Sequence, residues 1–461
     1  MTRLLDPADP RPIHFVGIAG AGMSALAELF VLRGIRVTGC DSHPENAPDL
    51  ERRGIVVESG HSPGHVASAR ALVVTSAMAK SHPELARARE LGLPVVRRAE
   101  ALGEATAGAT LVGVAGTHGK STTTVMTTEA LAAGGLDPTG YVGARVTSWG
   151  GNLRPGSAER FVVEADEYDR SFLALTPTMA VVTNLEADHL DIYADLADLH
   201  RTFAQFASRA RYVVLCADDA GANALPTPPS AEVIRYGLHS PDARLRATSL
   251  RRAGLGTVFT VVYDGETLGD VEIAVPGEHN VRNALAALAA GLAFGLKVPA
   301  MAPGLAAFRG VERRFQLLGE IDGALVVDDY AHHPTEVRAT IEAARGAAPD
   351  RRLVVAFQPH LFSRTRDFAR EFAAALLLAD VVFLADIYPA REQPIAGVTS
   401  DLIADAMAAE GRAPRWRGAI GELAVALAPS LQPGDLVVTM GAGDVTRVGP
   451  LLLAAAGTPA T

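Results

Sequence analysis

The chain has 461 residues, of which 48% are hydrophobic and 20% charged, and its formal net charge is −10 at pH 7. This length exceeds that of one typical domain and predicts about three. The acidic balance argues against a non-specific nucleic-acid binder. The two cysteines, Cys40 and Cys216, do not form a disulfide framework and fit a reducing compartment.

Neither the first residues nor the longest apolar run is typical of a membrane protein. The first twelve residues, MTRLLDPADPRP, lack the apolar core of a signal peptide. The longest helical apolar run, ALAALAAGLAFGL, stops at Lys297 after thirteen residues, whereas a membrane span needs about 18 or more. We therefore expect a cytoplasmic protein with no membrane partner.

Residues 1–108 alternate short apolar runs with a helical pattern. The runs IHFVGI, IRVTGC and ALVVTSAM predict strands, and GMSALAELFVLR predicts a helix that ends at Gly34. Strands that alternate with helices predict a parallel, doubly wound sheet.

A glycine turn, GIAGAGMS, follows the first of these strands. With Asp41 about 20 residues further on, it resembles the start of a dinucleotide-binding unit, although Ala19 stands where the middle glycine is expected. Such a turn can hold a diphosphate at the helix N-terminus near Met23 and Ser24, and Asp41 can accept hydrogen bonds from a ribose or a base. A sheet turn with a surface aspartate is the alternative.

Residues 109–318 begin with a second glycine loop, GVAGTHGKSTTT. An apolar run precedes this loop and a helical pattern follows it, and that arrangement cradles phosphate with backbone N–H groups. Lys120 adds a positive charge, and Ser121 can offer its hydroxyl to magnesium. The spacing departs from the standard loop, because only two residues separate Gly116 from Gly119. A glycine turn with a solvated lysine is the alternative.

Two further predicted strands of this block end in polar clusters, FVVEADEYD and MAVVTNLEADHLD. Ligands of open parallel sheets bind at the carboxyl ends of strands, so these clusters should share a cleft with the phosphate loop. Ser121 and Glu164 form a candidate pair of magnesium ligands, since this ion prefers hard oxygen donors. An acidic surface cluster is an equal alternative for Glu164, and spacing alone favours a solvated loop histidine for His189.

The motif PGEHNVRNALAAL places Asn280 and Asn283 on one face of a helix. Amide side chains pair well with the edge of adenine, which makes both residues candidates for base binding. A helix cap explains Asn280 equally well.

Residues 319–461 repeat the strand-then-helix pattern, for example in RLVVAFQPHLFSRTRDFAREFAAAL, and predict another parallel sheet. An arginine fork grips carboxylate or phosphate, although arginines on helix faces are more often solvated. The candidate anion clamps are Arg313, Arg314, Arg364 and Arg366. Asp329 lies with His332 and His333 at a strand-to-helix turn, at the expected reactive edge.

Ten motifs resemble those of the Mur ligase family and occur in the order of that family, over nearly the whole chain. They are HFVGIAGAGMS, GTHGKSTTT, EADE, TNLEADHLD, HNVRNALAA, VERRFQ, DDYAHHPTE, FQPHLFSRT, YPAREQPIAGV and MGAGD. The resemblance implies an α/β protein of three domains. These are a Rossmann-like UDP-sugar domain at 1–108, a central P-loop ATPase-like domain at 109–318 for ATP, and a Rossmann-like C-terminal domain at 319–461 for the amino acid and part of the nucleotide.

The resemblance also implies roles for single residues. It assigns the UDP-sugar to Gly20, Ala21, Gly22, Met23, Ser24, Asp41, His61 and Ser76. It assigns ATP to Gly116, Thr117, His118, Gly119, Lys120, Ser121, Thr122, Asn280, Asn283, Arg314 and Asp329. It implies Ser121, Glu164 and His189 as ligands of Mg²⁺, which replaces the solvated-loop interpretation of His189. The implied catalytic residues are Lys120, Glu164, His189 and Arg314, and the implied contacts of the amino acid are His360 and Arg364.

Within the family, FQPHLFSRT and YPAREQPIAGV are typical of the alanine-adding type. The resemblance therefore implies ligation of L-alanine to the carboxylate of UDP-N-acetylmuramate, with ATP, through an acyl phosphate, in peptidoglycan precursor synthesis. The substrates would be the partners of a monomer or weak homodimer that binds no nucleic acid. Tyr168 in EADEYD departs from this type. It also occurs in the related ligase that recycles whole tripeptides onto the same sugar, which is the alternative.

Two rivals from other classes explain less of the sequence. A nicotinamide dehydrogenase would leave the phosphate loop at 113–124 unexplained. A non-catalytic nucleotide switch would leave the polar turns of 319–461 unexplained.

We expect activity that does not depend on bicarbonate. Several Mur ligases carry a carbamylated lysine that supports the second metal. Here Ala204 stands at the corresponding position, and no lysine lies between Lys120 and Lys297. The rate in bicarbonate-free buffer should be full, short carboxylates should not raise it, and intact mass should show no carbamate. A reproducible dependence of the rate on bicarbonate would contradict this expectation.

Overall fold

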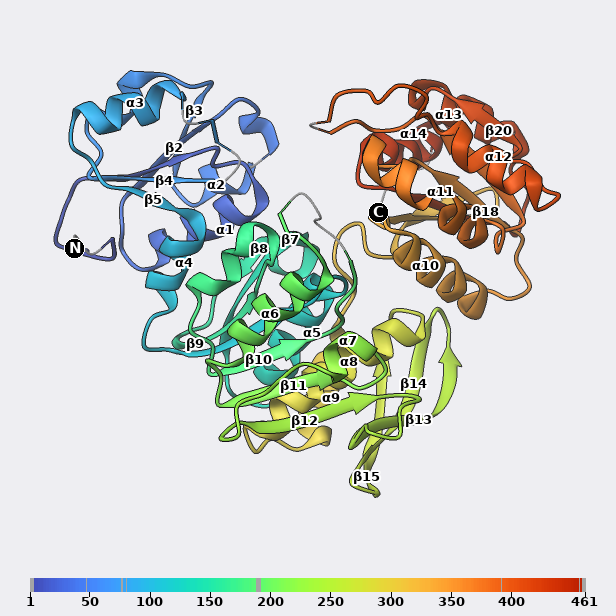
Figure 1. Cartoon of the computed structure of the whole chain (residues 1–461), viewed down its shortest axis with the longest axis horizontal. Helices are drawn as coiled ribbons and strands as arrows, with labels where there is room; N and C mark the ends of the chain where they lie inside the picture. The colour runs from blue at the N-terminus through green and yellow to red at the C-terminus, as the bar shows by residue number, and fades with distance from the viewer. Residues whose placement is uncertain are drawn as a thin grey trace. The chain divides into compact units, whose positions relative to one another are not determined.

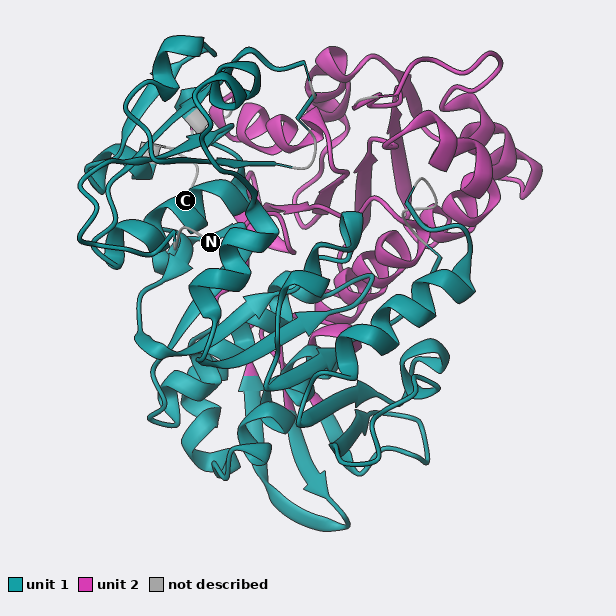
Figure 2. Cartoon of the chain, turned by 60° about the vertical axis from the view of Figure 1, so that its left-hand side comes forward, with its two compact units in different colours: residues 1–250, 259–272, 281–308 teal, residues 251–258, 273–280, 309–461 magenta. Residues whose placement is uncertain are grey.

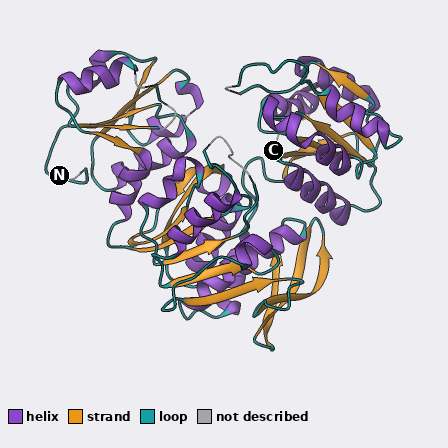
Figure 3. Ribbon diagram, in the orientation of Figure 1, coloured by secondary structure: helices purple, strands orange, loops and turns teal. Residues whose placement is uncertain are grey.

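The computed structural model describes residues 4–46, 48–75, 78–79, 81–187, 192–390, 392–455 and 457. Its strands form three sheets with helices beside them (Figure 1, Figure 3), which confirms the predicted α/β fold class. The chain divides into two compact units (Figure 2). Unit 1 comprises residues 1–250, 259–272 and 281–308, and unit 2 comprises residues 251–258, 273–280 and 309–461. No described helix is long and apolar enough to cross a membrane.

The first sheet belongs to unit 1 and is parallel throughout, in the order β3-β2-β1-β4-β5. Its strands are β1 (Ile13–Val16), β2 (Val37–Asp41), β3 (Val56–Ser59), β4 (Ala71–Val74) and β5 (Val95–Arg97). The central strands β1 and β4 are buried along their whole length. Continuous apolar runs suit such strands, because helices cover both faces of a parallel sheet. The helices are α1 (Ala21–Leu32), α2 (Pro48–Arg52), α3 (Pro83–Glu90) and α4 (Arg98–Thr106).

The second sheet has ten strands in the order β15-β14-β13-β12-β11-β10-β6-β9-β7-β8. The strands that carry the site are β6 (Thr110–Ala115), β9 (Ser157–Glu164) and β10 (Met179–Val182), which are parallel neighbours. The others are β7 (Pro138–Val146), β8 (Gly151–Arg154), β11 (Tyr212–Cys216), β12 (Glu232–Gly237), β13 (Leu245–Ala253), β14 (Gly256–Tyr263) and β15 (Glu266–Ile273).

The helices of this region are α5 (Lys120–Ala133), α6 (Leu196–Ala207), α7 (Ala220–Asn223), α8 (Glu278–Ala293) and α9 (Val298–Ala307). The predicted helix after the phosphate loop is α5, and it is buried on nearly every side from Ser121 to Thr128. Parallel pairing of β9, β6 and β10 brings their carboxyl ends to one edge, where the loop before α5 also lies.

The third sheet forms the core of unit 2, in the order β16-β17-β21-β18-β19-β20. Only the edge pair β16 and β17 is antiparallel among the described pairs of this sheet. Its strands are β16 (Gln316–Ile321), β17 (Ala324–Asp329), β18 (Leu353–Phe357), β19 (Val381–Ala385), β20 (Trp416–Gly418) and β21 (Leu436–Met440). The helices are α10 (Pro334–Ala347), α11 (Phe362–Leu376), α12 (Asp401–Ala409), α13 (Ile420–Leu427) and α14 (Val448–Ala455). Two apolar clusters pack on its two faces, as expected for a sheet covered by helices on both sides.

Candidate functional site

The loop of residues 116–119, between β6 and α5, has a shape that only glycine allows. Gly116 has a φ of 141°, and a Cβ there would come within 2.0 Å of Thr183 Oγ1. Gly119 has a φ of 81°, and its Cβ would lie 2.9 Å from Asn283 Oδ1. Side chains would therefore be both strained and obstructed at these two positions. The glycine spacing that departs from the standard phosphate loop therefore matches what this turn requires.

Hydrogen bonds with the side chains of Thr183 and Asn184, which follow β10, hold this loop in place. The N–H of His118 donates to Asn184 Oδ1 at 2.8 Å, and Thr183 Oγ1 donates to the His118 carbonyl at 2.6 Å. No acidic residue lies in the first turn of α5. The N–H groups and the positive dipole end of this helix therefore favour an anion such as phosphate. Ser121 and Thr122, in that first turn, are both buried.

Lys120 is held by its own loop and by a buried carboxylate. Its Nζ donates to the Gly116 carbonyl at 2.6 Å and to the Thr117 carbonyl at 3.1 Å. It also pairs with Glu167 Oε1 at 2.9 Å, and the Glu167 side chain is only 2% exposed. Burial alone disfavours the ammonium, but the surrounding carboxylates, Glu167 first, outweigh it and raise the pKa of Lys120. The charge at the phosphate loop is therefore permanent at physiological pH.

Ser121 and Glu164 face each other at the same edge of the sheet. Ser121 Oγ donates to Glu164 Oε1 at 3.0 Å, and the Gly143 N–H donates to Glu164 Oε2 at 2.7 Å. Burial raises the pKa of Glu164, and hydrogen bonds and Lys120 oppose that shift only in part. A hydroxyl and a carboxylate are the hard oxygen donors that Mg²⁺ prefers, so these residues fit the predicted ion. His189 and Ser76 lie outside the described residues.

A cavity of about 340 Å³ in unit 1 lies between the glycine turn of the first sheet and the carboxylates at the end of β9. It is lined by Gly17, Gly20, Ala21, Gly22, Met23, Thr75, Arg98, Tyr141, Gly143, Glu164 and Asp166. The Gly20–Met23 turn and Glu164 therefore open onto one space, although more than a hundred residues separate them in the sequence. The cavity therefore leads from this turn to the carboxylates of Glu164 and Asp166.

The sequence interpretation missed several lining residues of this cavity, among them Arg98, Tyr141 and Asp166. Arg98 pairs with Asp166 at 3.3 Å and lies within 3.4 Å of the Tyr141 hydroxyl. Tyr141 in turn donates to the Gly22 carbonyl. Tyr141, Asp166 and Glu164 together raise the pKa of Arg98. Asp166 is part of the EADEYD motif, but nothing in the local sequence of Arg98 or Tyr141 indicates that they meet.

The predicted nucleotide residues of the first sheet take part in its turns. Asp41 Oδ2 accepts the N–H of Ala19 at 2.9 Å, so this carboxylate supports the glycine turn. Ser24 Oγ donates to the Ala21 carbonyl within the same turn. His61 Nδ1 lies 3.2 Å from Cys40 Sγ. Contacts of Asp41 and His61 with a nucleotide stay predictions.

Asn280 and Asn283 have different surroundings. Asn283 Oδ1 accepts the hydroxyl of Thr123 at 3.1 Å, beside the phosphate loop in unit 1. Asn280 belongs to unit 2, where its Nδ2 donates to the Pro276 carbonyl at 2.7 Å at the start of α8. Asn280 is the third residue of α8, and in this contact its side chain donates, whereas a capping side chain accepts an N–H. The contact is therefore not the helix cap of the alternative, and the role of Asn280 towards adenine stays a prediction.

In unit 2, two arginines lie over the ring of Tyr330. The guanidinium carbons of Arg313 and Arg314 are 4.8 and 5.0 Å from the ring centre. Arg313 also donates to the Gly441 carbonyl at 2.6 Å and pairs with Asp328, which makes it part of the sheet edge. Arg314 pairs with Glu336 at 3.6 Å.

Asp329 ends β17 and is buried. It accepts the N–H groups of Phe315 and Ala331 at 2.7 and 2.8 Å. Burial raises the pKa of Asp329 to about 6, although Arg314 and the two N–H groups oppose the shift. A carboxylate with this pKa is close to titration in neutral solution.

His360 and Arg364 lie together at the carboxyl edge of the third sheet. Arg364 Nη1 is 3.5 Å from His360 Nδ1, and Arg364 is only 9% exposed. The imidazole of His360 stacks on Tyr388 and meets the ring of His332 edge to face. The other arginine of this motif, Arg366, is exposed and pairs with its neighbour Asp367, as the solvated alternative predicts.

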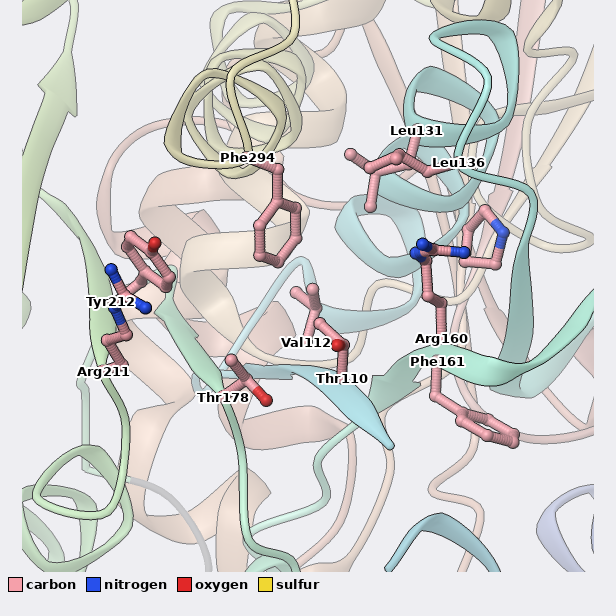
Figure 4. Close-up of a pocket in the computed structure, with 11 residues that line it drawn as sticks. Thr110, Val112, Leu131, Leu136, Arg160, Phe161, Thr178, Arg211, Tyr212 and Phe294 are labelled. Atoms are coloured by element: carbon pink, nitrogen blue, oxygen red, sulfur yellow. The ribbon is translucent and has the colours of Figure 1, made fainter. Parts of the chain in front are cut away.

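A second cavity, of about 310 Å³, lies at the opposite edge of the second sheet (Figure 4). Thr110 and Tyr212, the first residues of β6 and β11, line it together with Phe294, Arg160 and Arg211. The amino ends of the strands point to this side, so the cavity is separate from the phosphate loop.

Three family models match consecutive parts of the chain. They are described as "Mur ligase family, catalytic domain" at residues 12–110, "Mur ligase middle domain" at 114–291 and "Mur ligase, glutamate ligase domain" at 313–443. The UDP-N-acetylmuramate–L-alanine ligase of Salinibacter ruber is 44% identical over 443 residues, which are 95% of this chain and 93% of that protein.

Solved structures show the same likeness. The UDP-N-acetylmuramate-alanine ligase of Thermotoga maritima has a TM-score of 0.82 and 28% identity, covering 96% of this chain and 99% of that one. A murein peptide ligase from Psychrobacter arcticus has a TM-score of 0.69 and 26% identity, covering 97% and 99%.

Substitution of Gly116 tests the shape of the phosphate loop. Gly116→Ala forces a Cβ against Thr183, so calorimetry should show ATP binding weakened at least about tenfold, or ~1.4 kcal/mol. Gly135→Ala is the matched control, because Gly135 also has a positive φ and follows the same helix, but nothing lies near its Cβ. Equal losses of ATP affinity in the two variants would contradict this prediction, because they would show that backbone strain and not the contact with Thr183 weakens binding.

The raised pKa of Asp329 predicts a pH dependence of stability. Because the folded-state pKa, about 6, exceeds the ordinary value of 3.8, the contribution of Asp329 to stability is full below pH 3.8 and falls as pH rises towards 6. The difference in melting temperature between wild type and Asp329→Asn should therefore shrink over this range. Asp322→Asn, at an exposed turn residue, should follow the wild type. Parallel curves for wild type and Asp329→Asn would contradict the assignment.

Proposed function

Because the chain belongs to the Mur ligase family, we propose that it joins L-alanine to the carboxylate of UDP-N-acetylmuramate and uses ATP to activate that carboxylate. The observation that carries this proposal is likeness over nearly the full length to ligases of that name. The phosphate loop beside an acidic, magnesium-compatible edge supports it, since the proposed reaction needs both.

The chemistry explains why phosphate is required. A carboxylate resists an amine, because its oxygen leaves poorly and its charge repels nucleophiles. In the first step, a carboxylate oxygen attacks the γ-phosphorus and ADP leaves, which gives an acyl phosphate. In the second step, the amine of alanine attacks the acyl carbon, the amine loses its proton, and inorganic phosphate leaves from the tetrahedral intermediate.

We assign the charge stabilisation of the first step to Lys120. Its ammonium lies at the phosphate loop, where charge builds up on the transferred group, and phosphoryl transfer depends on such positioning and electrostatics. Glu167 is the proposed positioning residue, because it holds Lys120 Nζ at 2.9 Å. ATP phosphates at the N–H groups of residues 116–122 would compete with the Gly116 and Thr117 carbonyls for this ammonium.

Ser121 and Glu164, with His189, are the proposed ligands of Mg²⁺. The ion would neutralise phosphate charge during transfer, as metals do in related phosphoryl-transfer sites. Glu164 already accepts two hydrogen bonds in a buried position. Burial disfavours the charged form of this carboxylate, and an ion there would supply the positive charge that stabilises it.

We propose that the UDP-sugar binds at the glycine turn of the first sheet. The diphosphate would accept N–H groups from Gly20 to Ser24 at the start of α1, whose first turn has no acidic residue. The carboxylate to be activated would extend through the 340 Å³ cavity towards Glu164. Arg98, which lines the same cavity, is a proposed further contact of this anionic substrate.

The proposed contributions of unit 2 are contacts with alanine and with part of ATP. Arg364, beside His360, is suited to the carboxylate of the amino acid, because its planar guanidinium grips a carboxylate in two places. Arg314, Asp329 and Asn280 are the proposed contacts of the nucleotide. We propose the domain limits 1–108, 109–318 and 319–461, and a monomer or weak homodimer.

We place the reaction in the cytoplasm. Both cysteines are free and buried, which fits a reducing compartment. The alternative function is ligation of a whole tripeptide to the same sugar, which Tyr168 and the likeness to a murein peptide ligase support.

Release of inorganic phosphate separates these functions. We expect release from ATP only when UDP-N-acetylmuramate and L-alanine are both present, and little competition from the tripeptide L-alanyl-γ-D-glutamyl-diaminopimelate. Lys120→Ala should abolish the release but preserve binding of the UDP-sugar. Faster turnover with the tripeptide than with alanine would favour the recycling ligase, and release without any sugar would contradict both.

A further inference from the structure

Four metal-ligating side chains of unit 1 come together beneath the glycine turn of the first sheet. They are His14 on β1, Cys40 on β2, His65 on the short 3-10 helix η2 (Pro63–Val66) and Glu84 on α3. Each offers one ligand atom, and all four atoms lie within 4.8 Å of one another. His14, Cys40 and Glu84 are at most 1% exposed. None of the four has a role in the proposed ligation.

The distances converge on the Glu84 carboxylate. Cys40 Sγ lies 3.1 and 3.2 Å from its two oxygens, His65 Nδ1 lies 2.9 Å from Oε1, and His14 Nε2 lies 3.9 Å from Oε2. Bond lengths of 2.0–2.3 Å in a tetrahedral zinc site put neighbouring ligand atoms roughly 3.3–3.8 Å apart. The cluster is therefore near the size that one ion needs. The two ligand atoms that lie farthest apart would have to approach each other by about 1 Å to reach the spacing of a tetrahedral site.

Two features of this cluster favour a bound cation. The Nε2 atom of His14 is buried and has no hydrogen-bond partner, while Nδ1 of the same ring is fixed by Thr38 Oγ1 at 3.0 Å. Glu84 is fully buried, and within the described residues its ion-pair partners are histidines alone. Glu84 Oε1 also accepts the N–H of Ser62 at 2.9 Å, so the carboxylate is hydrogen-bonded, but no lysine or arginine among the described residues pairs with its charge. A buried charge without a cationic partner and an orphaned imidazole nitrogen are both costly.

We propose that His14, Cys40, His65 and Glu84 bind one zinc ion as a structural site. Zinc takes cysteine, histidine and carboxylate ligands in tetrahedral geometry, and structural zinc sites are closed to solvent. The thiolate and the carboxylate together balance the two charges of the ion, so the buried site is neutral. Binding releases the thiol proton of Cys40 to solvent.

The position of this site links it to the glycine turn. The Cys40 carbonyl accepts the N–H groups of Gly17 and Ile18 at 2.8 and 3.1 Å. Asp41, the next residue, accepts the N–H of Ala19. An ion on Cys40 would therefore link strands β1 and β2 to η2 and α3, directly beneath the proposed diphosphate site.

Cobalt titration of the untagged full-length chain tests the proposal. The protein is dialysed against a chelator, kept reduced with a phosphine, and titrated with Co²⁺ and then Zn²⁺. We expect one equivalent of Co²⁺, intense tetrahedral d–d bands and a thiolate-to-cobalt charge-transfer band, and loss of these bands when Zn²⁺ replaces Co²⁺. Zinc should also raise the melting temperature of the wild type.

Variants identify the ligands. Cys40→Ala should lose the charge-transfer band, and Cys216→Ala, which removes the other buried cysteine, should keep it. If Cys40→Ala does not fold, His65→Asn is the second variant, because the His65 side chain is 18% exposed and its replacement is tolerated more easily. The His65→Asn variant should bind Zn²⁺ at least tenfold more weakly than the wild type.

Three results would overturn the assignment. They are sub-stoichiometric binding of Zn²⁺ by the wild type, persistence of the charge-transfer band in Cys40→Ala, and loss of binding in His82→Asn. The last result would move the ion to the neighbouring group of His61, His82 and Glu84.

Discussion

The pairing of Lys120 with Glu167 is the interaction on which the site depends. The phosphate loop needs a fixed positive charge, but a buried ammonium is unfavourable unless a carboxylate accompanies it. Glu167, itself 2% exposed, supplies this carboxylate, and two loop carbonyls orient Lys120 Nζ. Both glycines of the loop are needed to orient these carbonyls towards Lys120, because a side chain at 116 would collide with Thr183 and one at 119 with Asn283.

The sheets place the other groups relative to this charge. Parallel pairing of β9, β6 and β10 delivers Glu164, the phosphate loop and Asn184 to one edge. Within the same unit, the 340 Å³ cavity joins this edge to the glycine turn of the first sheet. In the proposed reaction, the sugar-linked carboxylate would extend through this cavity to Glu164, which accepts a hydrogen bond from Ser121 in the helix after the phosphate loop. The acyl phosphate must then be kept from water until the amine attacks.

Periodicity and turn chemistry were enough to predict the strands and helices around the site. The runs IHFVGI and ATLVGVAG are the buried strands β1 and β6, and the helix after GTHGKS is α5. Contacts between distant segments could not be predicted in the same way. Tyr141 and Gly22 meet only because helix α1 packs against strand β7, and Arg98 joins them from a third segment. The EADEYD motif predicted acidic residues at the edge of the sheet where the phosphate loop lies. Which of them pairs with Lys120 depends on the turn after β9, which places Glu167 beside Lys120.

The central claim is that the γ-phosphate of ATP activates the sugar carboxylate, and an isotope label tests it most directly. UDP-N-acetylmuramate with both carboxylate oxygens as ¹⁸O is converted with ATP and L-alanine, and the released phosphate is analysed by mass spectrometry. The acyl-phosphate route predicts one ¹⁸O atom in each phosphate and one in the new amide. Unlabelled phosphate released together with the amide product would contradict the account.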